Sequence, residues 1–408
     1  MLTLEPARKA RVGRMKIAIA LAGGGPLGAF YEVGALHALS EAIQGRALVD
    51  ADVFTGVSSG ALIAAGLANR FDTTTMGSMF IDDESTLFPF SPAMLLQPAL
   101  GEYAKRLAEL PNVILRAAEQ YMREPLSGAW SAAAGSMGRL IPAAVFANGP
   151  LEHYLRAVFN SPGHTDDFRK LKSRLYIVAT NLNTGESVHF GGPGNDRVPI
   201  SRAVLASAAL PGLYCAVEID GQQFVDGALF RTMNASLALE EGCSLVICIN
   251  PLVPFDASRA SARHANLPDE GLPAVLSQTF RSLIYSRMQV GMASYRTRYP
   301  AADTLLLEPD RNDERLFFTN VFRYTGRKRL AEHAYQRTRH DLLAQAEALG
   351  PLLRRHGLRL NKEVLRDRHR TFSTAGEERA ARARHAARDL GQALGRLENV
   401  LSSSRSTA

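Results

Sequence analysis

The stretch MKIAIALAGGGPLG, residues 15–28, decides the fold that we expect for this 408-residue chain. Its first half, Met15 to Leu21, is a short and mostly apolar run, which predicts a buried parallel strand. Three consecutive glycines follow, and Gly28 to Ser40 then places side chains at helical spacing, at Phe30, Val33, His37 and Leu39. The stretch therefore predicts a strand that turns through a glycine-rich loop into a helix.

A second turn from strand to helix comes shortly afterwards. Val53-Phe54-Thr55 predicts a short strand, and the small, apolar residues of Ala61 to Ala68 predict a helix packed closely on a sheet. Between them, Gly56-Val57-Ser58-Ser59-Gly60 fits the pattern G-x-S-x-G, in which a serine nucleophile occupies a tight, strained turn between small neighbours. Amides at the start of the helix can stabilise negative charge beside Ser58. The alternative is an ordinary loop of glycine and serine.

The glycine-rich loop, Gly23-Gly24-Gly25-Pro26-Leu27-Gly28, presents several backbone N–H groups without side chains in the way. One interpretation is a dinucleotide site, because the loop also fits G-x-G-x-x-G and Asp50 or Asp52 stands near the distance of a ribose-binding acid. That acid should end a second strand, however, and here the strand follows Asp52. The other interpretation is an oxyanion hole formed by Gly23, Gly24, Gly25 and Gly28. We favour it because it also explains Ser58.

A partner for the serine has to come from later in the chain. Asp226-Gly227-Ala228 follows the strand-like Gln223-Phe224-Val225, although Asp-Gly is common in turns. In an α/β-hydrolase a histidine would follow late in the sequence. The late histidines all fall in basic, helix-like sequence and are expected to be solvated helix residues: His333, His340, His356, His369 and His385.

Together the three motifs resemble the patatin-like phospholipase family, which carries a glycine-rich loop, a G-x-S-x-G elbow and a D-G-[AG] motif in this order. The resemblance implies a lipid acyl hydrolase with a Ser58–Asp226 dyad, no catalytic histidine, and no metal or cofactor. It also implies a patatin-like three-layer α/β/α core with a mostly parallel central sheet. Residues 179–185 and 206–212 match the family as well. Leu27 departs from it, because the family usually has Arg or Lys at this position.

We expect the catalytic domain to span residues 15–310, between a basic N-terminal extension (1–14) and a helical C-terminal region (311–370). Residues 71–150 show no strand signal and predict a helical insertion, with a helix over Tyr103 to Tyr121. This insertion is expected either to cap an acyl-chain pocket or touch a membrane, or to add a helical layer to the core. A basic helical tail is expected over 371–408.

The formal net charge of +7 is concentrated near the end of the chain. Residues 351–408 contain 13 Lys/Arg and 6 Asp/Glu, so the rest of the chain is balanced. An apolar stripe with heptad-like spacing follows in the tail, at Ala383, Ala387, Leu390, Leu394, Leu397 and Leu401. The tail is expected to pack on its own domain, to self-associate, or to approach anionic lipid as a peripheral contact. Nucleic-acid binding is not expected, because the tail lacks interleaved aromatic residues.

The cysteines and the N-terminal residues indicate the cellular compartment in which we expect the protein. Cys215, Cys243 and Cys248 are odd in number and lie in or beside apolar stretches, which indicates free thiols in a reducing compartment. The basic first residues and the apolar run after them superficially resemble a signal peptide, but the run is short and enters a glycine loop. We expect a cytoplasmic protein without a cleaved signal. The alternative function is a non-catalytic lipid-binding or scaffold protein on the same fold.

Overall fold

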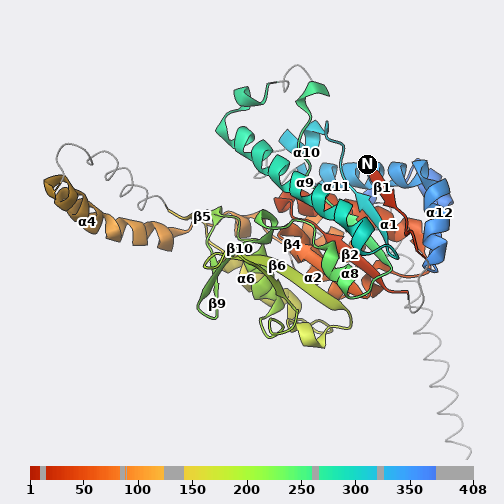
Figure 1. Ribbon diagram of the computed structural model, residues 1–408, viewed down its shortest axis with the longest axis horizontal. Coiled ribbons are helices and arrows are strands. Elements are labelled where there is room, and N and C mark those ends of the chain that lie inside the picture. The colour runs from red at the N-terminus through yellow and green to blue at the C-terminus, as the bar shows by residue number, and fades with distance from the viewer. Residues whose placement is uncertain are drawn as a thin grey trace, which may run out of the picture.

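The computed structural model describes residues 1–9, 15–82, 88, 90–123, 142–259, 266–318 and 326–373. Helices cover both faces of a central sheet (Figure 1). This confirms the α/β architecture with a mostly parallel central sheet that we expected from the sequence.

The sheet contains nine strands among the described residues. Its centre is five parallel strands, in the order β12 (Asp303–Leu307), β11 (Leu245–Ile249), β2 (Ile17–Leu21), β4 (Val53–Val57) and β6 (Arg174–Asn181). Antiparallel strands extend it at both ends: β1 (Leu2–Glu5) beside β12, and β7 (Ser187–Phe190), β10 (Gln222–Asp226) and β9 (Val217–Ile219) beyond β6. The carboxyl ends of the parallel strands therefore share one edge, where α/β proteins place their ligand sites.

Successive side chains along a strand point alternately toward the two helical layers. In β2, Ile17, Ile19 and Leu21 belong to one core, whereas Ala18 and Ala20 belong to the other. The first core packs against α1 (Gly25–Ala42), α2 (Ser59–Ala68), α7 (Ile200–Ser207) and α11 (Arg327–Ala344). The second packs against α8 (Ala235–Glu240) and α9 (Leu272–Arg298), which completes the three layers (Figure 1).

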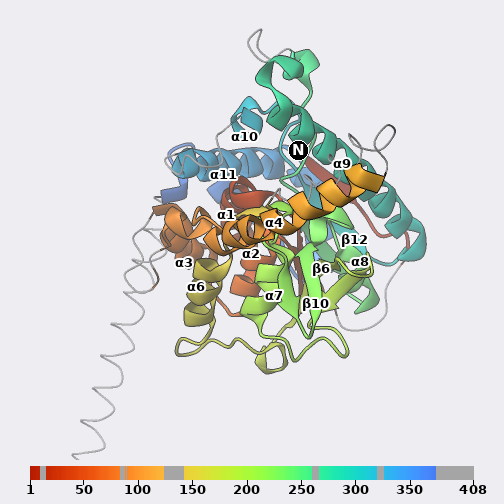
Figure 2. The same ribbon diagram turned by 90° about the vertical axis from the view of Figure 1, so that its left-hand side faces the viewer.

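The remaining helices lie around this core. They are α3 (Thr73–Gly77), α4 (Leu100–Arg123), α6 (Gly149–Phe159), α10 (Glu314–Phe318), α12 (Ala346–Arg355) and α13 (Lys362–Arg366). Two small strand pairs join distant segments: β3 (Ile43–Gln44) with β13 (Arg359–Leu360), and β5 (Ala144–Phe146) with β8 (Gly212–Tyr214). Helix α4 projects from the body, and Figure 2 looks onto the side from which it projects.

The structure corrects several expectations. Residues 2–5, assigned to an N-terminal extension, form β1 and pair with β12 in the central sheet. The predicted insertion over residues 71–150 contains the strand β5 as well as the expected helix, which α4 confirms with wider bounds. These strands were missed because runs of three to five residues carry little periodicity of their own. The predicted tail stripe, from Ala383 to Leu401, lies outside the described residues.

Candidate active site

Ser58 stands at the turn between β4 and α2. Its backbone has φ 54° and ψ −122°, a conformation that side chains rarely adopt and that a nucleophile elbow requires. The flanking glycines are dictated by close backbone contact. A Cβ on Gly56 would lie 2.4 Å from the carbonyl oxygen of Gly60, and one on Gly60 would lie 2.6 Å from those of Leu21 and Ala22. The elbow therefore needs Gly56 in order to turn tightly into α2, and Gly60 in order to fit against the end of β2.

The strand register brings Asp226 beside Ser58. On β6, Val178 pairs with Val57 of β4, and the next residue, Ala179, pairs with Asp226 of β10. Strand β7 pairs with residues 177–180 of β6, so β4 and β10 must share the opposite edge of β6. Strand β10 thus pairs with β6 beyond the point where β4 ends, and this places Asp226 next to Ser58. The two residues are 168 positions apart in the sequence, so their spacing alone could not predict the contact.

The Asp226 carboxyl is almost completely buried, with 3% of the residue exposed. Burial raises its pKa from 3.8 to about 6, while hydrogen bonds from the Ser58 side chain and the Ala228 amide oppose the rise. The Ala228 N–H lies 2.8 Å from the carboxylate oxygen Oδ1. Gly227 allows this turn, since a Cβ there would lie 2.3 Å from the Val178 carbonyl oxygen. The carboxylate is therefore oriented and more basic than in water.

The glycine-rich loop lies against both catalytic candidates. A Cβ on Gly23 would lie 3.1 Å from the Cβ atoms of both Ser58 and Ala228, so the three sequence motifs meet at this residue. The Gly23 N–H donates to Thr232 Oγ1 at 3.3 Å. The amides of Gly24 and Gly25, at the start of α1, donate to no acceptor within the described residues. These two amides are the ones left to bind a developing oxyanion.

The backbone amide of Gly28, unlike those of Gly24 and Gly25, is already hydrogen-bonded. Its N–H donates to the carbonyl of Gly24 at 3.0 Å as part of α1, so it is not available to an oxyanion. A Cβ at this position would lie 3.1 Å from both Pro251 Cγ and Ser59 Oγ. The assignment of Gly28 to the oxyanion hole is therefore wrong, and the residue instead allows α1 to approach α2. Leu27, the residue that departs from the family pattern, is buried in the first core, on the α1 side of the sheet.

Two supporting residues were not identified as site residues from the sequence. Ser207, at the end of α7, accepts the Ser58 N–H at 2.8 Å and donates to the Val178 carbonyl at 2.6 Å. Thr232 accepts the Gly23 N–H. Ser207 lies within the family-like stretch 206–212, which was the available signal. Thr232 lies in no motif, and only the fold brings it to the loop.

Within the described residues, no histidine is hydrogen-bonded to Ser58 or Asp226. A Ser-His-Asp arrangement does exist elsewhere, because Ser244 Oγ lies 3.3 Å from His356 Nδ1 and His356 Nε2 lies 2.6 Å from Asp303 Oδ2. All three residues are buried. Ser244 also donates to the Lys16 carbonyl, so the cluster joins chain segments and presents no accessible nucleophile. The expectation that His356 is a solvated helix residue is wrong.

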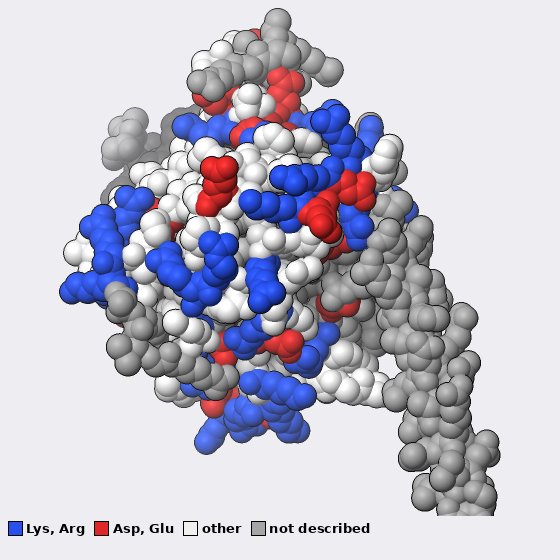
Figure 3. Space-filling model, turned by 90° about the vertical axis from the view of Figure 1, so that its right-hand side faces the viewer, with Lys and Arg blue, Asp and Glu red and all other residues white. Residues whose placement is uncertain are grey.

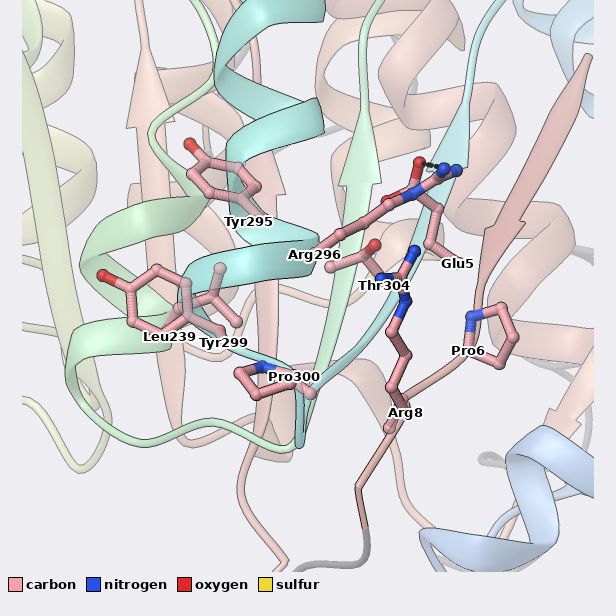
Figure 4. Close-up of a pocket in the computed structure, with 11 residues that line it drawn as sticks. Glu5, Pro6, Arg8, Leu239, Tyr295, Arg296, Tyr299, Pro300 and Thr304 are labelled. Atoms are coloured by element: carbon pink, nitrogen blue, oxygen red, sulfur yellow. Dashed lines mark hydrogen bonds and ion pairs between the residues drawn. The ribbon is translucent and has the colours of Figure 1, made fainter.

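A cavity of about 340 Å³ lies at the other edge of the sheet, lined by residues that include Arg8, Tyr295, Arg296, Tyr299 and Thr304 (Figure 4). Thr304 is near the start of β12, whereas Ser58 follows the carboxyl end of β4, and these strands run parallel. In the cavity, Arg296 is paired with Glu5 (Figure 4). The cavity is therefore remote from the candidate active site.

None of the helices in the described ranges combines the length and apolar character needed to span a bilayer. The same ranges contain no group of three or more His, Cys, Asp or Glu side chains placed to bind a metal ion.

The chain matches a protein-family model and is similar to several solved structures. The family model described as Patatin-like phospholipase matches residues 19–239, a range that contains Gly23, Ser58 and Asp226. Similar solved structures are VipD from Legionella pneumophila (16% identity, TM-score 0.31, 63% of this chain and 55% of that one) and the type III effector protein ExoU (16%, 0.28, 83% and 65%). A complex of ExoU with SpcU from Pseudomonas aeruginosa also matches (16%, 0.23, 84% and 65%). The chain thus spans less than two thirds of these proteins.

Proposed function

The chain belongs to the patatin-like phospholipase family, and we propose that it is a lipid acyl hydrolase of the phospholipase A, lysophospholipase or esterase type. In this proposal Ser58 is the nucleophile and Asp226 is its base. The observation that carries the proposal is the strand register, which sets a buried carboxylate beside a serine on a strained elbow.

The proposed reaction begins when the Asp226 carboxylate accepts the Ser58 hydroxyl proton as Oγ attacks the ester carbonyl carbon. The carbonyl oxygen takes up negative charge, which the Gly24 and Gly25 amides stabilise; losing one such donor costs about 2.7–4 kcal/mol in other enzymes. The tetrahedral species then collapses. The bond to the alcohol oxygen breaks, and that oxygen takes the proton from Asp226. An acyl group remains on Ser58.

Water completes the cycle by the same route. Asp226 accepts a proton from the water molecule that attacks the acyl-enzyme, and it returns this proton to Ser58 Oγ as the fatty acid leaves. A carboxylate with an ordinary pKa is a weak base for a hydroxyl group. The burial that raises the pKa of Asp226 to about 6 therefore supports its role.

The first test is covalent labelling with a fluorophosphonate probe. The wild-type protein should be labelled at Ser58, and Ser58→Ala should lose both labelling and ester turnover while keeping its circular dichroism spectrum. Ser59→Ala is the matched control, because the Ser59 hydroxyl is buried without a hydrogen-bond partner in the described structure. Persistent labelling of Ser58→Ala would disprove the assignment.

The competing proposal is a lipid-binding protein that lacks turnover. The observation that favours this second proposal is Leu27, which is buried at a position where the family usually has a basic residue. A lipid panel assayed by mass spectrometry separates the two: released fatty acid that depends on Ser58 supports the hydrolase. Lipid binding with no product from any phospholipid, lysophospholipid or neutral ester supports the binding protein.

A further inference from the structure

Helix α9 carries apolar side chains on two opposite faces. Its inner face is buried against the sheet through Ile284, Met288, Met292 and Tyr295. Its outer face exposes a row of large apolar side chains, which we call the α9 stripe: Leu272, Leu276, Phe280, Leu283 and Val290. Steps of four, four, three and seven residues keep this row on one side of the helix. Exposed leucines are common singly, but an aligned row indicates a contact surface.

The charges of α9 indicate what kind of surface it contacts. Its 27 residues contain no Asp or Glu, and its four charged residues are all arginines, at 281, 287, 296 and 298. Helix α4 makes an informative comparison. It also exposes Leu107, Leu110 and Ile114, but it carries acids among its basic residues. Arg281 donates to the Val253 carbonyl and Arg296 pairs with Glu5. Arg287 and Arg298 are therefore the exposed arginines left to face lipid headgroups. An apolar row accompanied by these two arginines complements an anionic lipid surface, because headgroups attract the arginines and acyl chains accept the apolar side chains.

Helix α9 is attached to the active-site edge at two points. The Gln278 side chain bonds both the N–H and the carbonyl of Phe255, in the segment that follows β11. Arg287 Nη1 lies 3.5 Å from the Leu229 carbonyl oxygen, and its guanidinium lies over the Phe230 ring. Leu229 ends the turn that begins with Asp226 and Gly227. A surface bound along the α9 stripe would therefore lie close to the turn that carries Asp226.

We propose that the α9 stripe docks the protein on the surface of an anionic lipid bilayer and so presents the active site to its substrate. The choice of a lipid surface rests on the proposed hydrolase function. The helix lies flat on the surface in this arrangement, as interfacial helices with basic residues do. Docking does not require the tail beyond residue 373.

The test uses full-length protein carrying Ser58→Ala, so that the vesicles are not hydrolysed. Sedimentation with vesicles of phosphatidylcholine and phosphatidylglycerol measures binding, with pure phosphatidylcholine as the uncharged reference. Adding Phe280→Ser and Leu283→Ser, at positions 50% and 56% exposed, should weaken binding by more than about tenfold. The matched control adds Leu107→Ser and Ile114→Ser on α4, at positions 70% and 59% exposed, and should change binding less than about twofold.

A second measurement reports how deeply the α9 stripe enters the bilayer. Phe280→Trp should show more quenching by brominated acyl chains than Leu107→Trp, with the native Trp130 present in both proteins. With Ser58 intact, the α9 pair should hydrolyse a soluble short-chain ester at the wild-type rate. That result shows an intact fold and separates docking from chemistry.

Three results would overturn the docking proposal. Binding that is equal in the α9 and α4 pairs would place the contact elsewhere. Binding that persists in the α9 pair but is lost on removing residues 374–408 would assign it to the tail. A dimer in light scattering that the α9 pair dissociates, without vesicle binding by the parent, would assign the stripe to a second copy. If wild type hydrolyses no ester while the parent binds vesicles through α9, the hydrolase proposal fails and docking stands.

Discussion

At the scale of single residues, the site depends on how far burial changes one carboxyl group. In the proposed mechanism Asp226 must be ionised to accept a proton from Ser58, and its pKa of about 6 puts that ionisation close to neutrality. Burial is the largest cause of this shift, and the hydrogen bond from Ser58 limits it. We therefore expect the same residue to control both the pH dependence of activity and part of the stability.

The first prediction is a pH profile. Turnover of a soluble ester, as kcat/KM, should rise with pH through a midpoint near 6 and stay level toward pH 8, because protonated Asp226 cannot act as a base. A series of buffers at constant ionic strength checks this. The ordinary pKa of a histidine is about 6.5, and burial lowers the pKa of His189 below it, so this residue needs a control. His189→Gln should keep the midpoint; a midpoint that disappears in this variant would implicate the histidine.

The second prediction concerns Asp226→Asn, which should remove turnover and raise stability. A carboxyl whose pKa is raised on folding destabilises the folded state as pH rises from about 4 through 6, and the penalty is complete above that range. A shift from 3.8 to about 6 corresponds to roughly 3 kcal/mol at pH 8. The nearly isosteric amide avoids much of this penalty, so the variant should melt higher at pH 8, with a smaller difference at pH 4.5.

Asp220→Asn provides the control for that measurement. Asp220 is exposed in the turn before β10, and its φ of 49° is tolerated by asparagine. Its substitution should change neither turnover nor melting temperature. Destabilisation of Asp226→Asn at pH 8 would show that the carboxylate is stabilised by contacts that outweigh its burial.

At the scale of elements, three chain segments meet at the end of β4. Helix α7 contributes Ser207, whose hydroxyl joins the Ser58 N–H to the Val178 carbonyl of β6. This bridge holds the strained elbow in register with the sheet. The elbow conformation is therefore a property of α7, β4 and β6 together, and not of the motif alone.

The third prediction is that Ser207→Ala weakens the site without removing its chemistry. The substitution leaves the buried Ser58 N–H without an acceptor, which should cost about 1–3 kcal/mol of folding free energy by urea unfolding. Turnover should fall while fluorophosphonate still labels Ser58, because the nucleophile and base remain. Ser201→Ala is the control: this α7 hydroxyl bonds Asp166, away from the elbow, and its loss should affect stability more than turnover.

At the scale of the whole molecule, the catalytic body extends further along the chain than its motifs suggest. Arg370 pairs with Glu41 of α1, and Phe372 is buried against His37 of α1. Arg339 of α11 donates to the carbonyls of Val364, Asp367 and Arg370. A truncation near Arg370 would therefore cut into the folded body, and the boundary for removing the tail belongs after Ser373.

Charge is also uneven over the body, because residues 351–373, which belong to it, contain seven Lys/Arg and two Asp/Glu. Figure 3 shows Lys and Arg side chains spread over the side of the molecule on which α12 lies, with fewer acids between them. The excess positive charge near the end of the chain is therefore shared between the folded body and the tail beyond residue 373.

The fourth prediction is that protein ending at Ser373 keeps its chemistry. It should hydrolyse a soluble short-chain ester at the full-length rate, whereas protein ending at Leu358 should melt lower because it lacks β13, α13, Arg370 and Phe372. Thermal melts and an ester assay on the three lengths check this. We propose that residues 374–408 serve association. Unchanged oligomeric state and lipid binding, with a lower melting temperature on their removal, would instead make the tail part of the domain.

The sequence by itself determined the family, the α/β fold class and the three motifs, because each depends on local patterns. Ile17 to Leu21 is apolar enough to predict a buried strand, and Gly56 and Gly60 flank the serine within five residues. The glycine requirement of a tight turn and the periodicity of a strand or helix are written in adjacent residues.

Only the tertiary structure decided which groups meet and which are free to act. The pairing of β10 with the edge of β6 that β4 vacates brings Asp226 to Ser58, and this depends on register between strands distant in sequence. Whether an amide is available depends on its hydrogen bond in the folded chain, which removes Gly28 from the oxyanion hole. The exposure of α9 and the burial of His356 likewise depend on what packs against each side chain. Local sequence does not contain that information.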